Sequence, residues 1–341
     1  MVRGTRLWFA MALIAVPFSG AQAAPSVPVP KVEAAVRADM TLQRISGVAV
    51  AVMKHGQVVF AKGFGLANVE LKVPVKSDTK FQSGSMGKQF ASMAVMMLVE
   101  EGKVHLDDRL TTYFTDAPES WRKITVRQLL THTSGLANDI PWEDYRSDST
   151  EAQLLIRIEA IPLDFEPGAK WSYSNLGYKL IGMLIGKVTG KFYGDFLQER
   201  IFKPLGMNAT RIVSESDIIL HRAAGYDWQE NVLKNAPWVA PTMNTTADGA
   251  LYVTVLDLAR WDAALYSERL VKKASLDEMW SPVRLNDGQS AEYGFGWGLG
   301  AVNGHRFVEH GGAWQGFRTE ILPGRRRDYC YLVEGQKGEV Q

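Results

Sequence analysis

The alternation of apolar and polar residues changes along the chain and separates strand-forming ends from a helical middle. From Gly47 to Gly65, the runs GVAVAVMK and QVVFAKGFG are rich in Val and Phe and flank a His55-Gly56 turn, which predicts a β-hairpin. From Met86 to Glu101, the run MGKQFASMAVMMLVEE is apolar nearly all round. This pattern is typical of a buried helix, and Gly102 marks its end.

Helical patterns continue through residues 103 to about 280. We expect TVRQLLTHTSGL to end in a Ser-Gly C-cap, LGYKLIGMLIGKVTG to be helical, and TVLDLARWDAAL to open with Thr254 and Asp257 as a capping box. Strand patterns return from about residue 292 in YGFGWGLGAV, HRFVEHGG and GFRTEIL, and DYCYLVE offers one further strand. The order predicts an α+β fold, with an antiparallel sheet from both chain ends and a mainly helical middle region.

The first 23 residues have the pattern of a secretion signal. Two arginines precede an apolar run over residues 7–18, and Ala21-Gln22-Ala23 is a small-x-small cleavage motif. We therefore expect a signal peptide over 1–23, a mature chain from Ala24, and a periplasmic or secreted protein. No later stretch reaches the roughly 18 apolar residues that a membrane helix needs, so no membrane span is expected after signal removal. A retained N-terminal anchor is the alternative.

Residues 24–341 are expected to form one domain, with a sheet lobe at about 40–84 and 290–341 and a helical lobe at about 85–289. The 341-residue chain holds 38 basic and 37 acidic residues, and loss of the two signal-peptide arginines leaves 36 basic residues, a net charge of −1. This balance gives no reason to expect a nucleic-acid partner. The oligomeric state does not follow from the sequence.

Cysteine and histidine usage bears on metal and redox chemistry. Cys330 is the only cysteine, which excludes an internal disulfide and a zinc site with several cysteine ligands. The six histidines lack the H-x-x-x-H and H-E-x-x-H spacings of metal enzymes. We therefore expect no metal and no cofactor.

The motif S-x-x-K occurs three times, at residues 77–80, 85–88 and 120–123. In the second copy, Ser85 opens the predicted buried helix, and residues at i and i+3 of a helix share a face, so Lys88 could reach its hydroxyl. A serine hydroxyl needs a base to become a nucleophile, and a nearby lysine can act as one. Pattern alone does not choose among the three copies, and a serine in this place is often only an N-cap.

Two further segments could complete such a site. In WSYSN, residues 171–175, Tyr173 and Asn175 lie on a loop just before a helix, although a turn with Asn capping the helix would look the same. In EHGGAW, residues 309–314, two adjacent glycines on a strand would let another backbone approach closely. A glycine bulge is the alternative there, and a lone histidine such as His310 is more often a satisfied polar residue than a catalyst.

The elements SMGK, YSN and HGG occur in an order that resembles the serine β-lactamase and penicillin-binding protein-like superfamily, in its class C-like, D,D-peptidase and esterase branch. The segments LLTHTSGL at 129–136 and PGAKWSYSNLGYKLIG at 167–182 also resemble that branch, and the likeness covers roughly residues 40–323. The resemblance implies a β-lactamase-related serine hydrolase domain that forms an acyl-serine intermediate.

Residue roles follow from this resemblance. Ser85 would be the nucleophile, and Lys88 and Tyr173 would share the proton transfers, with the identity of the base left open. The resemblance further implies substrate-binding and oxyanion elements at Asn175, His310, Gly311, Gly312 and the backbone N–H of Ala313.

The substrate class is expected to be esters, β-lactams or D-amino-acid peptides, most of all those of an esterase or D,D-peptidase. His310 stands where many relatives carry Lys, and a mostly neutral imidazole attracts a substrate carboxylate less than an ammonium does, which disfavours β-lactams. The relatives usually continue after GFRTEILPG with another strand and a closing helix, whereas this chain offers one strand. The alternative function is a penicillin-recognising sensor or an inactive scaffold of the same fold.

Overall fold

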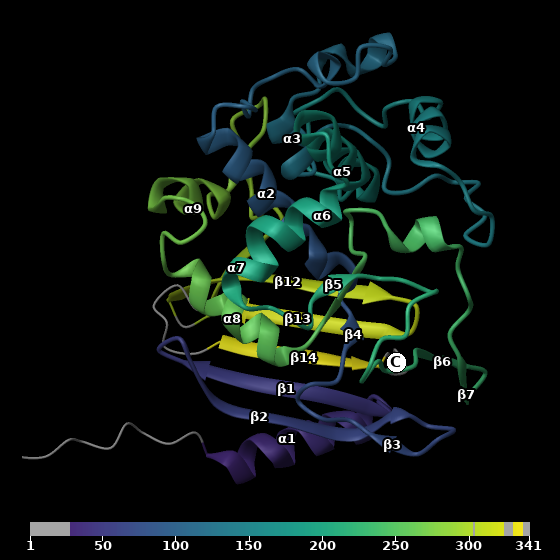
Figure 1. The fold of residues 1–341 in the computed structure, drawn as a ribbon. Coiled ribbons are helices and arrows are strands. Elements are labelled where there is room, and N and C mark those ends of the chain that lie inside the picture. Colours follow the sequence, from purple (N-terminus) through teal and green to yellow (C-terminus); the bar gives the residue numbers. More distant parts are fainter. Residues whose placement is uncertain (1–27, 303, 324–329, 337–341) are drawn as a thin grey trace, which may run out of the picture.

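A computed structural model describes residues 28–302, 304–323 and 330–336. Its centre is a seven-stranded antiparallel sheet in the order β11-β12-β13-β14-β1-β2-β3 (Figure 1). Strand β1 (Gly47–Lys54) pairs with β14 (Cys330–Gln336), so the two chain ends meet inside one sheet. The predicted α+β fold with a sheet from both ends is confirmed. The predicted signal peptide lies outside the described residues.

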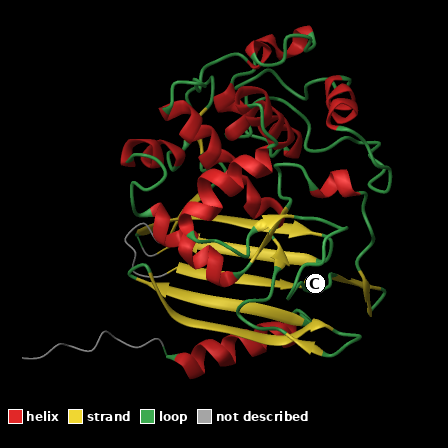
Figure 2. Ribbon diagram, in the orientation of Figure 1, coloured by secondary structure: helices red, strands yellow, loops and turns green. Residues whose placement is uncertain are grey.

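The N-terminal hairpin forms as predicted, from β1 and β2 (Gln57–Asn68). Its turn is possible because His55 and Gly56 adopt positive φ angles of 51° and 76°. Strand β1 is buried on both faces, since its valines pack against helix α1 (Val29–Leu42) and its alanines face the main core. The sheet is therefore a middle layer, with α1 on one face and the other helices on the opposite face (Figure 2).

The C-terminal strands lie on the other side of β14. The predicted strand patterns correspond to β11 (Gly298–Val302), β12 (His305–Trp314) and β13 (Phe317–Pro323), and β3 (Val73–Pro74) closes the opposite edge. Strand β12 runs close to the short 3-10 helix η1 (Gly84–Gly87), which precedes the central helix. One strand of the sheet thereby borders the segment that carries Ser85.

The central helix α2 (Lys88–Glu100) is buried from Lys88 to Leu98, as its apolar pattern predicts. It packs against α5 and α6 on the sheet's helical side. The helices of this region are α3 (Val126–Leu130), α4 (Glu151–Glu159), α5 (Asn175–Thr189), α6 (Tyr193–Leu197), α7 (Lys203–Leu205), α8 (Val255–Leu265) and α9 (Lys273–Met279). The short turns are η2 (Leu110–Thr112), η3 (Glu119–Lys123), η4 (Gln198–Phe202) and η5 (Pro241–Asn244).

The mainly helical middle region also contains short strands that the sequence did not predict. A three-stranded sheet joins β4 (Phe81–Gln82), β8 (Leu251–Val253) and β5 (Arg211–Ile212), and it holds the loop before β8 against the start of η1. Two small hairpins add β6 (Tyr226–Gln229) with β7 (Val232–Asn235), and β9 (Val283–Arg284) with β10 (Ser290–Ala291). These strands are two to four residues long, too short for an alternating pattern to reveal.

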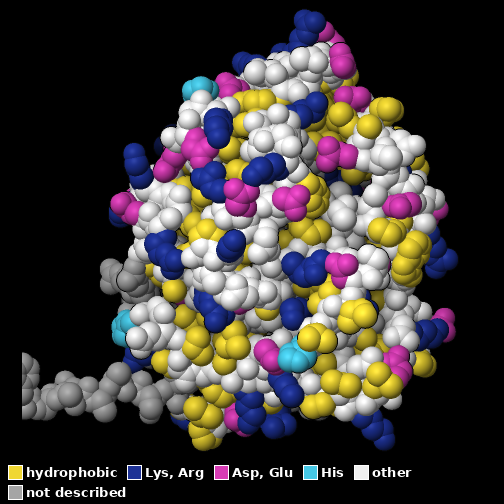
Figure 3. Space-filling view, in the orientation of Figure 1, with side chains coloured by type: hydrophobic (Ala, Val, Ile, Leu, Met, Phe, Trp, Pro, Cys, Tyr) yellow, Lys and Arg dark blue, Asp and Glu magenta, His cyan; other side chains and the backbone are white. Residues whose placement is uncertain are grey.

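Two predicted helix ends differ from the structure. Helix α3 stops at Leu130 rather than at the Ser-Gly pair, because His132 adopts a left-handed φ of 58° and the following chain is irregular. Thr254 caps α8 through the Asp257 N–H, but the Asp257 carboxylate accepts from residues 209 and 210 instead of closing a capping box. No helix in the described ranges is long and apolar enough to cross a membrane. On the face in Figure 3, basic and acidic side chains are interspersed.

Candidate active site

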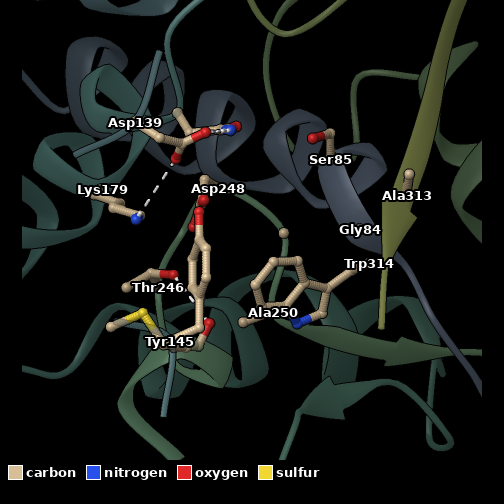
Figure 4. A pocket seen from close by; sticks show the side chains of 13 residues that line it. Gly84, Ser85, Asp139, Tyr145, Lys179, Thr246, Asp248, Ala250, Ala313 and Trp314 are labelled. Atoms are coloured by element: carbon tan, nitrogen blue, oxygen red, sulfur yellow. Dashed lines mark hydrogen bonds and ion pairs between the residues drawn. The ribbon is translucent and has the colours of Figure 1, made fainter. Parts of the chain in front are cut away.

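Ser85 lies in η1, between β4 and α2, where its hydroxyl is the accessible one. Its side chain is half-buried and lines a pocket (Figure 4). The neighbouring Ser83 and Met86 are buried. Gly84 has a φ of 50°, and a Cβ on it would lie 2.5 Å from the Ala313 nitrogen, so only glycine fits there. The close contact between η1 and β12 thus fixes the position of Ser85.

Lys88 is fully buried and is held by three hydrogen bonds. Its Nζ donates to Ser85 Oγ at 3.0 Å, to Asn175 Oδ1 at 2.7 Å and to the Asp248 backbone oxygen at 2.7 Å. Burial lowers the pKa of Lys88 to about 8, although the negative charges of Asp248 and Asp139 act to raise it. The amine is therefore placed at the Ser85 hydroxyl and is partly neutral near pH 7.

The other serines near a lysine lack this arrangement. The Lys80 ammonium donates to the Leu220 backbone oxygen at 2.8 Å, and Lys123 forms an exposed ion pair with Glu166 at 3.0 Å. The Ser83 hydroxyl is buried and donates to backbone oxygens. Of the three S-x-x-K copies, the structure thus joins serine and lysine by a hydrogen bond only at residues 85 and 88.

Tyr173 comes from the loop before α5, and its ring faces the same lysine. Lys88 Nζ lies 4.9 Å from the Tyr173 ring centroid. Among the described residues, the buried Tyr173 hydroxyl has no hydrogen-bond partner. Burial raises the pKa of Tyr173 above its usual value. The nearby Ser85 hydroxyl, which is not hydrogen-bonded to the phenol, lowers that pKa and so opposes the effect of burial. The phenol is therefore protonated, and its hydroxyl is free of hydrogen bonds to the described residues.

Asn175 is the first residue of α5, and Ser174 rather than Asn175 caps the helix. The Asn175 amide lies between two charged groups, because Oδ1 accepts from Lys88 and Nδ2 donates to Asp139 Oδ2 at 3.0 Å. This amide orientation is the one that satisfies both partners. Asn175 thus borders the pocket and orients Lys88, and its predicted contact with substrate stays a prediction.

His310 lies beside the site as a buried side chain whose two ring nitrogens are both engaged. The Ser174 N–H donates to His132 Nδ1, so His132 donates from Nε2 to the Tyr293 hydroxyl at 3.1 Å. Tyr293 then donates to His310 Nε2 at 2.9 Å, and His310 Nδ1 donates to the Gly311 oxygen at 2.6 Å. Burial lowers the pKa of His310 to about 4 and that of His132 well below its usual value, so both imidazoles are neutral.

This geometry differs from the expectation that His310 meets substrate. Among the described residues, the lining of the pocket beside Ser85 includes Ala313 and Trp314 of the same strand but excludes His310. The His132 ring stacks on Tyr173 with centroids 4.2 Å apart, which links the buried hydrogen-bond chain to the site. A direct substrate contact therefore stays a prediction for Ala313 and receives no support for His310.

The two glycines after His310 serve different purposes. A Cβ on Gly312 would lie 1.9 Å from the Ser83 oxygen, so the predicted close backbone approach is found there. Gly311 lies on the opposite face of β12, where a Cβ would meet the Glu320 carboxylate at 2.7 Å. Gly312 thus lets β12 contact η1, whereas Gly311 lies away from the pocket.

Three charged residues of the site were not found from the sequence. Asp139 and Asp248 line the pocket from loops, and Lys179 lines it from α5. The sequence could have indicated Lys179, because it is a charged residue in an apolar helix and lies four positions after Asn175. No sequence pattern indicated the two aspartates. In the described part of the chain, no group of three or more His, Cys, Asp or Glu side chains could hold a metal ion.

Comparison with known proteins places this geometry in a family. Residues 32–334 match the family model described as Beta-lactamase. The chain therefore belongs to the β-lactamase family. It is 32% identical to penicillin-binding protein 4* of Bacillus subtilis (strain 168) over 285 residues, which cover 78% of this chain and 63% of that relative. The chain spans about 61 to 63% of the length of this relative and of two other curated relatives that it matches.

Solved structures of similar shape extend this comparison. The D-amino acid amidase from Ochrobactrum anthropi SV3, complexed with L-phenylalanine amide, has a TM-score of 0.80 and 26% identity, covering 92% of this chain and 93% of that one. The octameric penicillin-binding protein homologue from Pyrococcus abyssi has a TM-score of 0.79 and 27% identity, covering 91% and 74%. Both likenesses extend over nearly the whole chain.

Proposed function

We propose that this protein is a hydrolase that transfers the acyl group of its substrate to Ser85 and then to water. The observation that carries the proposal is the 3.0 Å hydrogen bond between Lys88 Nζ and Ser85 Oγ, in a pocket open to a substrate. A nucleophile and a base within hydrogen-bond reach, with the base held by further groups, are what covalent acyl transfer requires. Membership of the β-lactamase family supports the same reaction class.

In the first step, neutral Lys88 accepts the Ser85 proton while Oγ forms a bond to the acyl carbon. Lys88 suits this part because its pKa is lowered to about 8, whereas burial raises the pKa of Tyr173 and keeps the phenol protonated. The Tyr173 phenol then donates a proton to the leaving group as the bond between that group and the acyl carbon breaks. Lys88 returns a proton to the phenolate. Attack by water on the acyl-serine releases the acid and restores the Ser85 hydroxyl.

The negative charge that develops on the acyl oxygen needs preorganised donors. We assign this part to the backbone N–H groups of Ser85 and Ala313, two residues that line the pocket. The absence of a side chain on Gly312 permits the contact between β12 and η1 that brings the two backbones together. The oxyanion site is therefore a product of the fold and needs no charged side chain.

The pocket favours neutral or amino-bearing acyl groups over anionic ones. Among the described residues, the Asp248 carboxylate has no ion pair, and the Lys179 ammonium is paired with Asp139 at 3.9 Å. His310 is neutral and offers no charge to a substrate carboxylate. We therefore propose esters and D-amino-acid derivatives as the substrate class, of esterase or D,D-peptidase type. The similarity to a D-amino acid amidase supports this choice.

The substrate proposal predicts a measurable preference. We expect a neutral short-chain nitrophenyl ester to be turned over with a kcat/KM at least about tenfold above that of a chromogenic cephalosporin, since tenfold needs only about 1.4 kcal/mol of charge repulsion. Side-by-side assays, with D-phenylalanine amide and a D-Ala-D-Ala peptide as further substrates, would measure it. Asp248→Asn should reduce the difference in kcat/KM between the ester and the cephalosporin. Equal or better cephalosporin turnover by the unaltered protein would contradict the proposal.

We also propose that the protein is exported and acts in the periplasm or outside the cell. The proposal rests on the basic start, the apolar run and Ala21-Gln22-Ala23. Mass analysis of the protein recovered from the periplasm or the medium should find Ala24 as the first residue. Recovery from the soluble fraction with Met1 still attached would show that the segment is not a cleaved signal.

A further inference from the structure

Lys179 is a buried ammonium group that the proposed reaction does not use. Its side chain is 4% exposed, and it lies on α5 one turn after Asn175, so the two side chains share a helix face. In the described part of the chain, its polar partner is Asp139 Oδ1, at 3.9 Å. A buried charge with one distant partner is costly, which calls for an explanation of its place beside the pocket.

Asp139 connects Lys179 to the catalytic lysine. One carboxylate oxygen faces Lys179, and the other accepts from Asn175 Nδ2 at 3.0 Å. This second bond fixes the Asn175 amide with its oxygen toward Lys88, where it accepts at 2.7 Å. Four contacts therefore run in sequence from Lys179 through Asp139, Asn175 and Lys88 to the Ser85 hydroxyl. Figure 4 shows the first of them, between Lys179 and Asp139.

We infer that Asp139 and Lys179 are positioning residues, which orient the Asn175 amide and together set the charge of Lys88 at the moment of attack. The inference rests on the proposed function, because it concerns the proton acceptor of that reaction. Neither residue needs to touch the reacting atoms. Each acts on Ser85 through Lys88, one as a negative and one as a positive neighbour.

Three charged residues from two loops and α5 act on the pKa of Lys88. Asp248 and Asp139 favour the protonated amine, whereas Lys179 favours the neutral amine. Four other titratable groups lie nearby, Tyr173, Tyr178, His132 and His310. They are uncharged because burial raises the pKa of both tyrosines and lowers the pKa of both histidines. Asp139 and Lys179 thus act in opposite directions on the pKa of Lys88. Removal of either residue should therefore shift that pKa in the direction set by the residue that remains.

The test is the pH dependence of kcat/KM on a neutral nitrophenyl ester. For the unaltered protein, activity should rise with pH through an apparent pKa of about 8, the value for Lys88. Asp139→Asn keeps an acceptor for Asn175 but removes the negative charge, so the rise should move to lower pH by roughly 0.5 to 1 unit. Lys179→Met should move it to higher pH by a similar amount. The double variant should return it close to the original position.

The control is Lys187→Met, an exposed lysine two turns further along α5, which should leave the profile unchanged. Lys179→Met leaves Asp139 as the remaining charge, and this variant is expected to fold because the Asp139 side chain is 30% exposed and accepts from Asn175. The test therefore stands even where Asp139→Asn, which leaves the buried Lys179 without its partner, does not fold. Shifts in the same direction, or no shift in Lys179→Met, would overturn the inference. Activity that survives Ser85→Ala would instead overturn the proposed function itself, so the two failures are distinguishable.

Discussion

Ser85→Ala is expected to lower kcat/KM for a nitrophenyl ester by roughly 10⁴-fold or more, because among the described residues Ser85 holds the one hydroxyl that is hydrogen-bonded to Lys88. The substitution removes one oxygen from a half-buried position, so the variant should fold like the unaltered protein. Circular dichroism and the melting temperature check the folding, and steady-state kinetics check the activity. An unchanged rate would show that the acyl group is not carried by Ser85.

The chain supplies matched controls for this experiment. Ser77→Ala and Ser120→Ala remove the serines of the other two S-x-x-K copies, whose lysines bond to Leu220 and Glu166. Both variants should retain full turnover. Loss of activity in either control, with an intact fold, would mean that the motif at residues 85–88 is not the one that matters.

Lys88→Ala should lower kcat by about 10² to 10⁴-fold, the usual contribution of a general base, while the KM for a neutral ester changes little. The reason is that Lys88 Nζ contacts the attacking oxygen and lies within a buried hydrogen-bond network. The substitution takes away the proton acceptor and leaves no charged group at position 88. Kinetics over a pH series measures the effect, and the rise near pH 8 should disappear with it.

Lys80→Ala and Lys123→Ala are the corresponding lysine controls. Their ammonium groups bond to the Leu220 backbone oxygen and to Glu166, so both variants should keep nearly full kcat. A Lys88→Ala variant that folds and turns over ester at the original rate would require another base. Tyr173 is the group that would then take this part.

Local patterns predicted those parts of the site that lie close together in the chain. Ser85 and Lys88 meet because three positions at a helix start place side chains on one face, a rule that needs no tertiary information. The hairpin of β1 and β2 and the burial of α2 followed for the same reason, since residue type and spacing decide them. Tyr173 and Asn175 were assigned to the site from the family resemblance, because their spacing alone does not predict a place beside Ser85.

Tertiary packing decided what the sequence did not reveal. Asp139 and Asp248 come from loops without a pattern of their own. Asp248 contacts Lys88 through its backbone oxygen and Asp139 acts through Asn175, and both arrangements depend on how distant segments pack. The position of His310 depends on Tyr293 and His132, which approach it from distant segments, so its burial could not be foreseen. The early end of α3 has the same origin, since the left-handed His132 belongs to that buried chain.

The most direct test of the central claim is to locate the covalent adduct that an acylating inhibitor leaves on the unaltered protein. After incubation with a reactive phosphonate ester, digestion and peptide mass analysis should find one modified residue, Ser85, and no adduct in the Ser85→Ala variant. The side chain is half-buried and borders the pocket, so the inhibitor can reach it. An adduct on Ser77, Ser83 or Ser120 would contradict the account, as would ester turnover without any adduct.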